Sequence, residues 1–92
     1  MNTDKNLGTA IKVYRLSVDK YDLIYTLYKL YDNVEERYCY SISVSMTEGA
    51  EWQSEYAYDI SSCEESSVEI FTIISEGEVF PCTLLEVLED IL

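Results

Sequence analysis

The groups that could do chemistry in this chain are carboxylates and thiols, because its 92 residues include eighteen aspartates and glutamates, three cysteines and no histidine. Two carboxylates can act together as general acid and base, but eighteen of them produce suitable spacings by chance, so the sequence singles out no pair. A nucleophilic triad usually takes its base from histidine. Three glycines are too few for a glycine-rich loop that binds nucleotide phosphates. We therefore expect a protein that is not an enzyme and binds no cofactor.

The cysteines are odd in number and far apart, at Cys39, Cys63 and Cys82, with no Cys-x-x-Cys pair. Without histidine, this spacing predicts neither a zinc site nor a disulfide framework. The acidic run from Glu48 to Glu51 is too sparse for a calcium loop. We expect no bound metal and reduced thiols in a cytoplasmic protein. Cys39, on the polar side of a predicted strand, is expected to react most readily with a labelling reagent.

Charge is distributed very unevenly along the chain. Residues 1–37 contain six acids and all six bases, whereas residues 38–92 contain twelve acids and no base, so the net charge of −12 arises entirely in the second part. Such a surface favours a basic partner and repels nucleic acid and anionic membranes. No stretch approaches the roughly 20 apolar residues of a membrane span, and the polar first residues predict no signal peptide.

The candidate partner-binding residues are acids of this second part and two tyrosines. Glu65, Glu69 and Glu76 fall on one face of a predicted helix, where like charges four residues apart destabilise by about 0.2–0.5 kcal/mol. An ordinary solvated face is the alternative, but solvated faces normally interleave both signs. Nine tyrosines exceed what one small core can hold, and tyrosine suits interfaces. The predicted partner-binding residues are Glu48, Glu51, Glu55, Asp59, Glu64, Glu65, Glu69, Glu76, Glu78, Tyr25 and Tyr28.

Three strands are predicted before these acids begin. Residues 37–47 alternate strictly between apolar and polar side chains, which is typical of a strand covered on one side only. Residues 9–18 and 21–31 are two further strands, and the turn composition of residues 32–36 predicts a hairpin between the second and third. A helix remains the alternative for residues 21–31, because their leucines also fit helical spacing, but the tyrosine-rich composition favours a strand.

A fourth strand is predicted to begin at Trp52. Its aromatic residues Tyr56 and Tyr58 are expected to face the core, as are Tyr38 and Tyr40 of the third strand, because all share the parity of core positions. The acids of the fourth strand are then expected to point away from the core.

Two helices are predicted after the strands. Ser62 and Thr83 each begin a capping box with a glutamate three residues later, and Gly77 is placed for the left-handed residue that ends the first helix near Glu76. In the second helix one apolar arc contains Leu84, Leu85, Val87, Leu88, Ile91 and Leu92.

The predicted fold class is α+β, an antiparallel sheet of three to four strands followed by two amphipathic helices packed on one face (ββββαα). We expect a single domain over residues 1–92, with residues 1–8 as a frayed leader.

Residues 56–92 carry a resemblance to a known group of proteins. They begin with YAYDIS and end, after an amphipathic helix, with EVFPCTLLEVLEDIL. The strand end at Asp59 to Ser61 and the pattern V-x-P-x-x-L-x-x-V-x-E-D over residues 79–90 resemble a family of short uncharacterised proteins of clostridia and related Firmicutes, which implies no activity. By size and acidity the chain is also similar to phage anti-CRISPR and anti-restriction proteins, and this likeness of composition implies binding in the basic channel of a nuclease.

The leading hypothesis is a small non-enzymatic inhibitor whose carboxylates stand in for phosphates on the nucleic-acid-binding surface of a larger basic protein, for example a Cas9-type nuclease. We expect this inhibitor to be a monomer or a homodimer. It would bind neither nucleic acid nor membrane directly. The alternative is a cytosolic housekeeping adaptor or regulator, dimeric through an open strand edge, whose acidity serves solubility.

Overall fold

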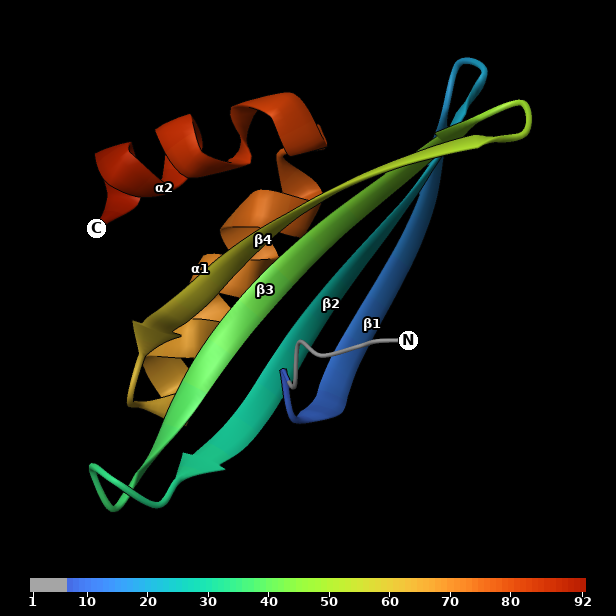
Figure 1. Ribbon diagram of the computed structural model, residues 1–92. Helices are drawn as coiled ribbons and strands as arrows, with labels where there is room; N and C mark the ends of the chain where they lie inside the picture. Colours follow the sequence, from blue (N-terminus) through green and yellow to red (C-terminus); the bar gives the residue numbers. More distant parts are fainter. Residues whose placement is uncertain (1–6) are drawn as a thin grey trace.

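The computed structural model describes residues 7–92, which form a four-stranded antiparallel sheet followed by two helices (Figure 1). The strands, hydrogen-bonded in sequence order, are β1 (Thr9–Val18), β2 (Tyr21–Asp32), β3 (Arg37–Glu48) and β4 (Glu51–Ser61). The helices are α1 (Glu64–Glu76) and α2 (Leu84–Ile91), and a 3₁₀ turn (Pro81–Thr83) leads into α2. The predicted α+β class and the order ββββαα are confirmed. Most of the predicted leader, residues 1–6, lies outside the described residues.

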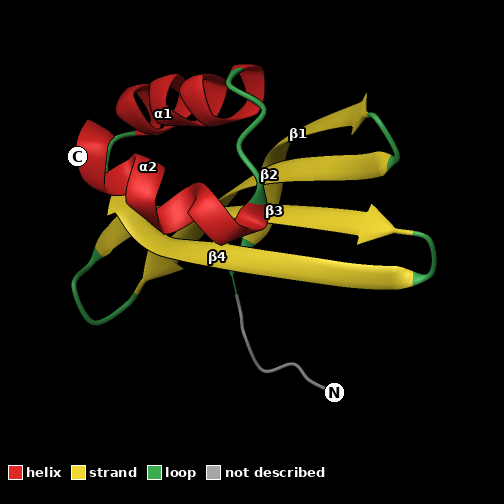
Figure 2. Cartoon of the chain, turned by 90° about the horizontal axis from the view of Figure 1, so that it is seen from above, coloured by secondary structure: helices red, strands yellow, loops and turns green. Residues whose placement is uncertain are grey.

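Both helices lie on one face of the sheet, so the molecule has two layers (Figure 2). The central strands β2 and β3 lie beneath the helices and supply most of the buried sheet residues. Alternate side chains of each strand point to the same face, so every second residue enters the core. Their core residues are Leu23, Tyr25, Leu27, Tyr40, Ile42, Val44 and Met46, packed against Ile70, Phe71 and Ile74 of α1 and Leu84 and Leu88 of α2. Residues 21–31 therefore form a strand, as their composition predicts, and not a helix.

Tyr25 is fully buried at the centre of this core. Its hydroxyl donates a hydrogen bond of 3.0 Å to the carbonyl oxygen of Val79, which joins the sheet to the segment between the helices. Burial raises the pKa of Tyr25 to about 12, because the phenolate would lose its hydration. The expectation that Tyr25 lies on a partner-binding surface is therefore wrong: its large ring fills the core and its polar tip is satisfied internally.

The side chains of β4 face the opposite way from the prediction. Ala57 pairs with Ile42 of β3 and is buried under the helices, whereas Tyr58 lies on the uncovered face and is 51% exposed. The small alanine leaves room for the helices, and the bulky tyrosines point to the face of the sheet that neither helix covers. Tyr38 is also largely exposed, so Tyr40 is the one of these four predicted core tyrosines that the core buries.

A bulge near the end of β4 changes the register. The step from Tyr40 to Ile42 in β3 covers two residues, whereas their partners Ser61 and Ala57 are four residues apart in β4. Asp59 adopts a left-handed φ of 51° in the bulge, and its backbone N–H donates to the hydroxyl of Ser41 at 3.1 Å. This extra length allows Ile60 to enter the core, although Tyr58 points outward.

The predicted capping boxes do not form. Cys63, and not Ser62, is the N-cap residue of α1, and neither helix has a side-chain hydrogen bond at its N-cap. The hydroxyl of Ser61 accepts a hydrogen bond from the N–H of Cys63, which moves the start of α1 by one residue. The hydroxyl of Thr83 donates to the carbonyl of Phe80 instead of capping α2.

Helix α1 ends at Glu76, as predicted, but its left-handed residue lies one position later than expected. Gly77 remains right-handed, with φ −80° and ψ 0°, and Glu78 is the left-handed residue with φ 55°. The N–H groups of Glu78 and Val79 donate to the carbonyls of Ser75 and Ile74, which is the pattern of a Schellman motif. Gly77 is still favoured, because a β-carbon there would lie 2.9 Å from the carbonyl oxygen of Ile73.

The apolar arc of α2 is wider than its contact with the rest of the molecule. Leu84 and Leu88 are buried, but Leu85 is 50% exposed and Leu92, just after the helix, is 68% exposed. The predicted six-residue arc is therefore buried only in part.

Replacing Leu84 by alanine should lower the free energy of unfolding by about 2–5 kcal/mol, because a fully buried leucine leaves a cavity when it is truncated. Leu85→Ala is the matched control and should cost about 0.5 kcal/mol or less, as surface substitutions usually do. Urea denaturation followed by circular dichroism measures both. Equal losses for the two variants would contradict the packing described for α2.

Candidate acidic interaction surface

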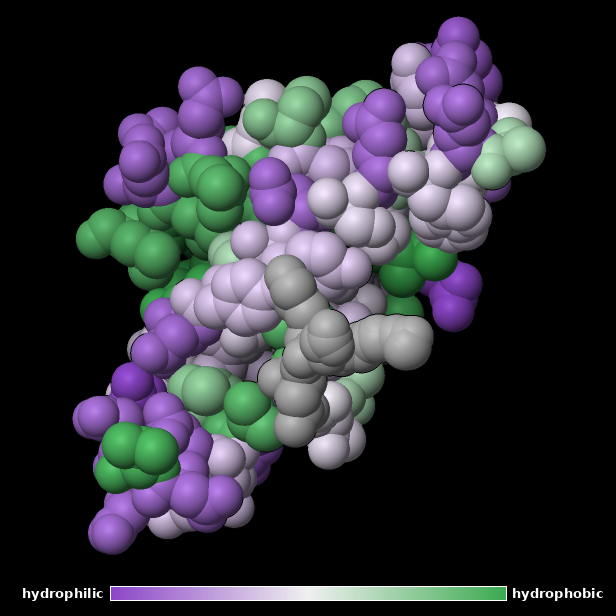
Figure 3. All heavy atoms as spheres, in the orientation of Figure 1, coloured by the Kyte–Doolittle hydropathy of each residue, from purple (hydrophilic) through white to green (hydrophobic). Residues whose placement is uncertain are grey.

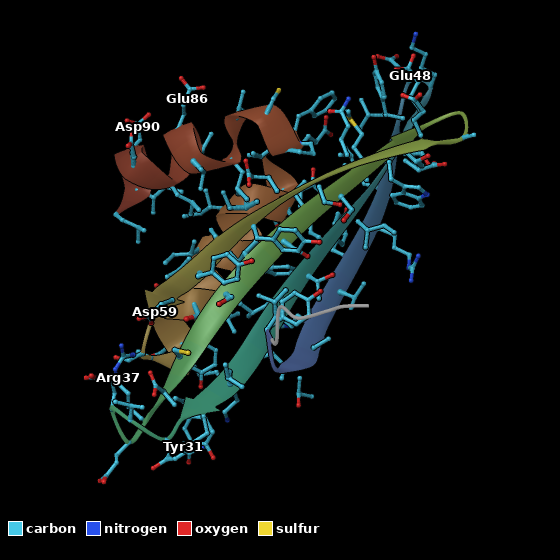
Figure 4. The ribbon with its side chains drawn as sticks, in the orientation of Figure 1. Tyr31, Arg37, Glu48, Asp59, Glu86 and Asp90 are labelled. Atoms are coloured by element: carbon cyan, nitrogen blue, oxygen red, sulfur yellow. The ribbon has the colours of Figure 1, made fainter. Side chains whose placement is uncertain are left out.

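Three of the predicted partner-binding acids form ion pairs within the molecule. Lys20 lies 2.7 Å from Glu48, Lys29 lies 3.2 Å from Glu64, and Arg37 binds Asp59 through two hydrogen bonds of 2.8 and 3.2 Å. Figure 4 shows Arg37 beside Asp59, and Glu48 at the far end of the sheet. These pairs link bases of residues 1–37 to acids of residues 38–92, so the charge imbalance seen in the sequence is partly neutralised in space.

Glu64 connects the start of α1 to the sheet. One of its carboxylate oxygens accepts hydrogen bonds of 3.2 Å from the Lys29 ammonium and from the Tyr40 hydroxyl. The Lys29 ammonium also lies 4.4 Å from the centre of the Tyr38 ring, a cation–π contact. The hydrogen bond to Glu64 raises the pKa of Lys29 above its ordinary value. Glu64 therefore has a structural role, whatever else it binds.

The acids of α1 are exposed, as the helical spacing predicts. Glu65, Glu69 and Glu76 lie on the side of α1 opposite its buried residues, and none has an ion pair among residues 7–92. Glu78 is exposed directly after the helix.

Helix α2 adds acids that the predicted site left out. Glu86, Glu89 and Asp90 are exposed and form no ion pair with any residue that the structure describes. Figure 4 shows Glu86 and Asp90 projecting away from β4. The same signal, acids without a nearby base in the sequence, could have identified them. We use the name acidic helical surface for Glu65, Glu69, Glu76, Glu78, Glu86, Glu89 and Asp90.

The remaining predicted residues lie elsewhere. Glu51 lies opposite Glu48 in the backbone ladder of β3 and β4, next to the turn that joins these strands. Glu55 is half-buried, and its side chain accepts a hydrogen bond from the N–H of Tyr56. Tyr28 is half-buried on the uncovered face of the sheet, with its hydroxyl 3.5 Å from that of Ser43. The molecule is 42 Å long, so the structure does not bring all of these residues to one surface.

The exposure of the thiols differs from what the strand pattern predicted. Cys39 is half-buried, and burial raises its pKa, whereas Cys63 is exposed. At the first turn of α1, hydrogen bonds from the N–H and hydroxyl of Ser66 and from the N–H of Glu65 lower the pKa of Cys63. Cys63, and not Cys39, is therefore expected to be the more reactive thiol.

Among residues 7–92, no three aspartate, glutamate or cysteine side chains are grouped as metal ligands would be. Over the same range, neither helix has the length and apolar content needed to cross a membrane.

A family model described as a family of unknown function (DUF6514) matches residues 4–92. Neither the curated proteins nor the solved structures include a significant match.

Cys63 should react with a disulfide reagent at lower pH than Cys39, because its lowered pKa gives more thiolate. The measurement is the pH–rate profile of thiol modification, with each site identified by mass spectrometry. The variant Cys63→Ser should lose the fast phase and keep the slow one. A fast phase that survives in this variant would contradict the assignment.

Arg37→Gln should raise the pKa of Asp59 toward its ordinary value, because the guanidinium hydrogen bonds that lower it are lost. An acid with a lowered native pKa adds stability above its unfolded pKa and loses it as pH falls through the native value. The stability difference between wild type and variant should therefore be present above about pH 4 and vanish in stronger acid.

NMR titration of the Asp59 carboxyl group and denaturation at several pH values measure the two effects. Lys12→Gln, at a cation without an ion pair among the described residues, is the control and should leave the pKa of Asp59 unchanged. An unchanged pKa of Asp59 in Arg37→Gln would show that the ion pair does not form in solution.

Proposed function

The chain belongs to the family of unknown function whose model spans residues 4–92, and we propose that it acts by binding and not by catalysis. In this proposal it is a cytoplasmic inhibitor whose acidic helical surface occupies the nucleic-acid-binding surface of a larger basic protein. A Cas9-type CRISPR nuclease is the example of such a partner, as in phage anti-CRISPR proteins.

The observation that supports this proposal best is the uncompensated charge of the helices. The bases Lys20, Lys29 and Arg37 all pair with acids at the sheet or at the first residue of α1, and no base follows Arg37 in the chain. None of the seven acids of the acidic helical surface has an ion pair among residues 7–92, so no salt bridge offsets the repulsion between them. Folding gains nothing from this repulsion, whereas a cationic partner would relieve it on binding.

The spacing of the α1 acids suits a surface that normally holds a phosphate backbone. Glu65 and Glu76 are separated by about 16 Å along the helix, a length over which one strand of B-DNA presents about five phosphates. Three carboxylates on α1 match only part of that charge, and the acids of α2 would supply more. Lysines and arginines that hold nucleic acid would then be occupied by carboxylates, which blocks the channel by competition.

A second candidate function is that of an adaptor or regulator that dimerises through a strand edge. The observation that favours it is the open sheet: β1 and β4 are its outer strands, and each has one edge that no strand within residues 7–92 covers. Sedimentation at increasing protein concentration tests it, because a dimer would form without any basic partner.

The inhibitor proposal predicts that changing Glu65, Glu69 and Glu76 together to glutamine weakens binding to a Cas9-type nuclease by about ten-fold or more. The fold should be unchanged or slightly more stable, because the repulsion between Glu65 and Glu69 is removed. The affinity of the wild type should fall steeply with added salt, and guide RNA or duplex DNA should compete with it. Fluorescence anisotropy measures each effect.

The control changes Asp4, Asp19 and Asp22 to asparagine, which alters net charge by the same amount in the charge-balanced part of the chain. This control should leave binding nearly unchanged. Equal losses for the two triple variants would point to net charge alone, and binding insensitive to salt would reject the proposal.

A further inference from the structure

A groove of about 590 Å³ lies between β4 and α2. Residues 56–60 of β4 line one side, where Ala57 and Ile60 face the helices, and the other side is formed by Leu85 and Leu88 of α2, followed by Leu92. In Figure 3 apolar surface gathers at the left of the molecule, where α2 lies in Figure 1, and hydrophilic surface borders it above. The groove is therefore apolar inside and polar at its rim.

The apolar walls of the groove are exposed because α2 has more apolar surface than the core covers. Leu85, Leu88 and Leu92 are spaced three and four residues apart, which places them along one side of the helix. The core buries Leu88, whereas Leu85 and Leu92 remain at least half exposed. On the β4 side, Ala57 and Ile60 face the helices, and Tyr58 borders the groove at the outer edge of the sheet. The groove thus has apolar side chains from both β4 and α2.

The charges around the groove are all negative once the ion pairs are counted. Glu89 lies in the groove wall without an ion pair among the described residues, and Glu86 and Asp90 project from the adjacent side of α2 (Figure 4). Asp59 contributes to the β4 wall, but Arg37 already neutralises it. An occupant would thus meet apolar walls and an anionic rim.

This charge pattern selects among the possible occupants. A second copy would bring the α2 acids of both chains together, and like charges across an interface are unfavourable. An anionic membrane or a nucleic acid would be repelled in the same way. A cationic segment with an apolar side would satisfy both the walls and the rim.

We infer that the groove binds a short amphipathic segment of a partner protein, with apolar side chains on one face flanked by lysines or arginines. Such a segment would place its apolar face between β4 and α2, as amphipathic helices do in hydrophobic grooves. The inference rests on the proposed function, which supplies the basic partner. It deepens that function by giving the same partner an apolar anchor beside the acidic helical surface.

The test uses the full chain, labelled with ¹⁵N, and a synthetic 18-residue helical peptide of leucine and lysine with all leucines on one face. Amide shifts on titration should concentrate at residues 56–60 and 85–92. A peptide of the same composition with scrambled leucine positions is the ligand control and should bind about ten-fold more weakly, because it has no apolar face.

The protein variants separate the groove from the rest of the acidic surface. The double variant Leu85→Ser with Leu92→Ser should weaken binding of the amphipathic peptide by about ten-fold. Ile73→Ser, at an apolar residue of α1 that is also 50% exposed, should leave that binding unchanged. Glu89→Gln should reduce the salt dependence of binding. The triple glutamine variant at Glu65, Glu69 and Glu76 should keep binding within about two-fold, so the peptide tests the groove independently of nucleic-acid mimicry.

Four results would overturn the inference. They are absence of binding, equal binding of the scrambled peptide, shifts confined to the outer face of α1, and self-association of the unliganded chain that the double serine variant abolishes. The first three would leave the proposed competition for a nuclease channel intact, and the last would assign the groove to a second copy of this chain.

Discussion

The structure depends on burying the apolar stripe of β2 and β3 beneath the two helices. Without the helices, alternate side chains of the two paired strands, such as Leu27 and Ile42, would face water. The hydrogen bond from Tyr25 to Val79 fixes the segment between the helices over that stripe. Because the helices are held by the core, their outer sides are free to carry a charge pattern that contributes nothing to folding.

Ion pairing divides the acids of the molecule into two groups. Those near the sheet, such as Asp59 and Glu64, meet the cations of β2 and β3 and help to hold the bulge and the start of α1. Those on the outer sides of the helices have no ion pair among residues 7–92. The ion pairs of the described chain thus lie at the sheet and at the first residue of α1, and the rest of the helical layer has none.

Local sequence patterns were enough to predict the strands, the turns and the fold class. The orientation and burial of single side chains, and the ion pairs, depend on contacts between residues far apart in the sequence. The alternation in residues 37–47 identified β3, and turn composition placed the hairpin before it. The predicted orientation of Tyr58 was wrong. Strict alternation along β4 is broken by the bulge opposite Tyr40 and Ile42, and that bulge depends on how β3 and β4 pair. Tyr25 was assigned to the surface because nothing local reports the depth of burial. The cations that bind Glu48, Glu64 and Asp59 are distant in sequence, so these pairs became visible only in the folded chain.

The central claim is that the acidic helical surface faces a cationic partner. Carbodiimide footprinting of carboxylates, with the protein free and bound to a Cas9-type nuclease, tests it most directly because every acid reports on its own contact. The account predicts that Glu65, Glu69 and Glu76 become protected in the complex, whereas Glu48 at the far end of the sheet keeps its reactivity. Protection confined to Glu48 and Glu51, with the helical acids as reactive as in the free protein, would contradict it.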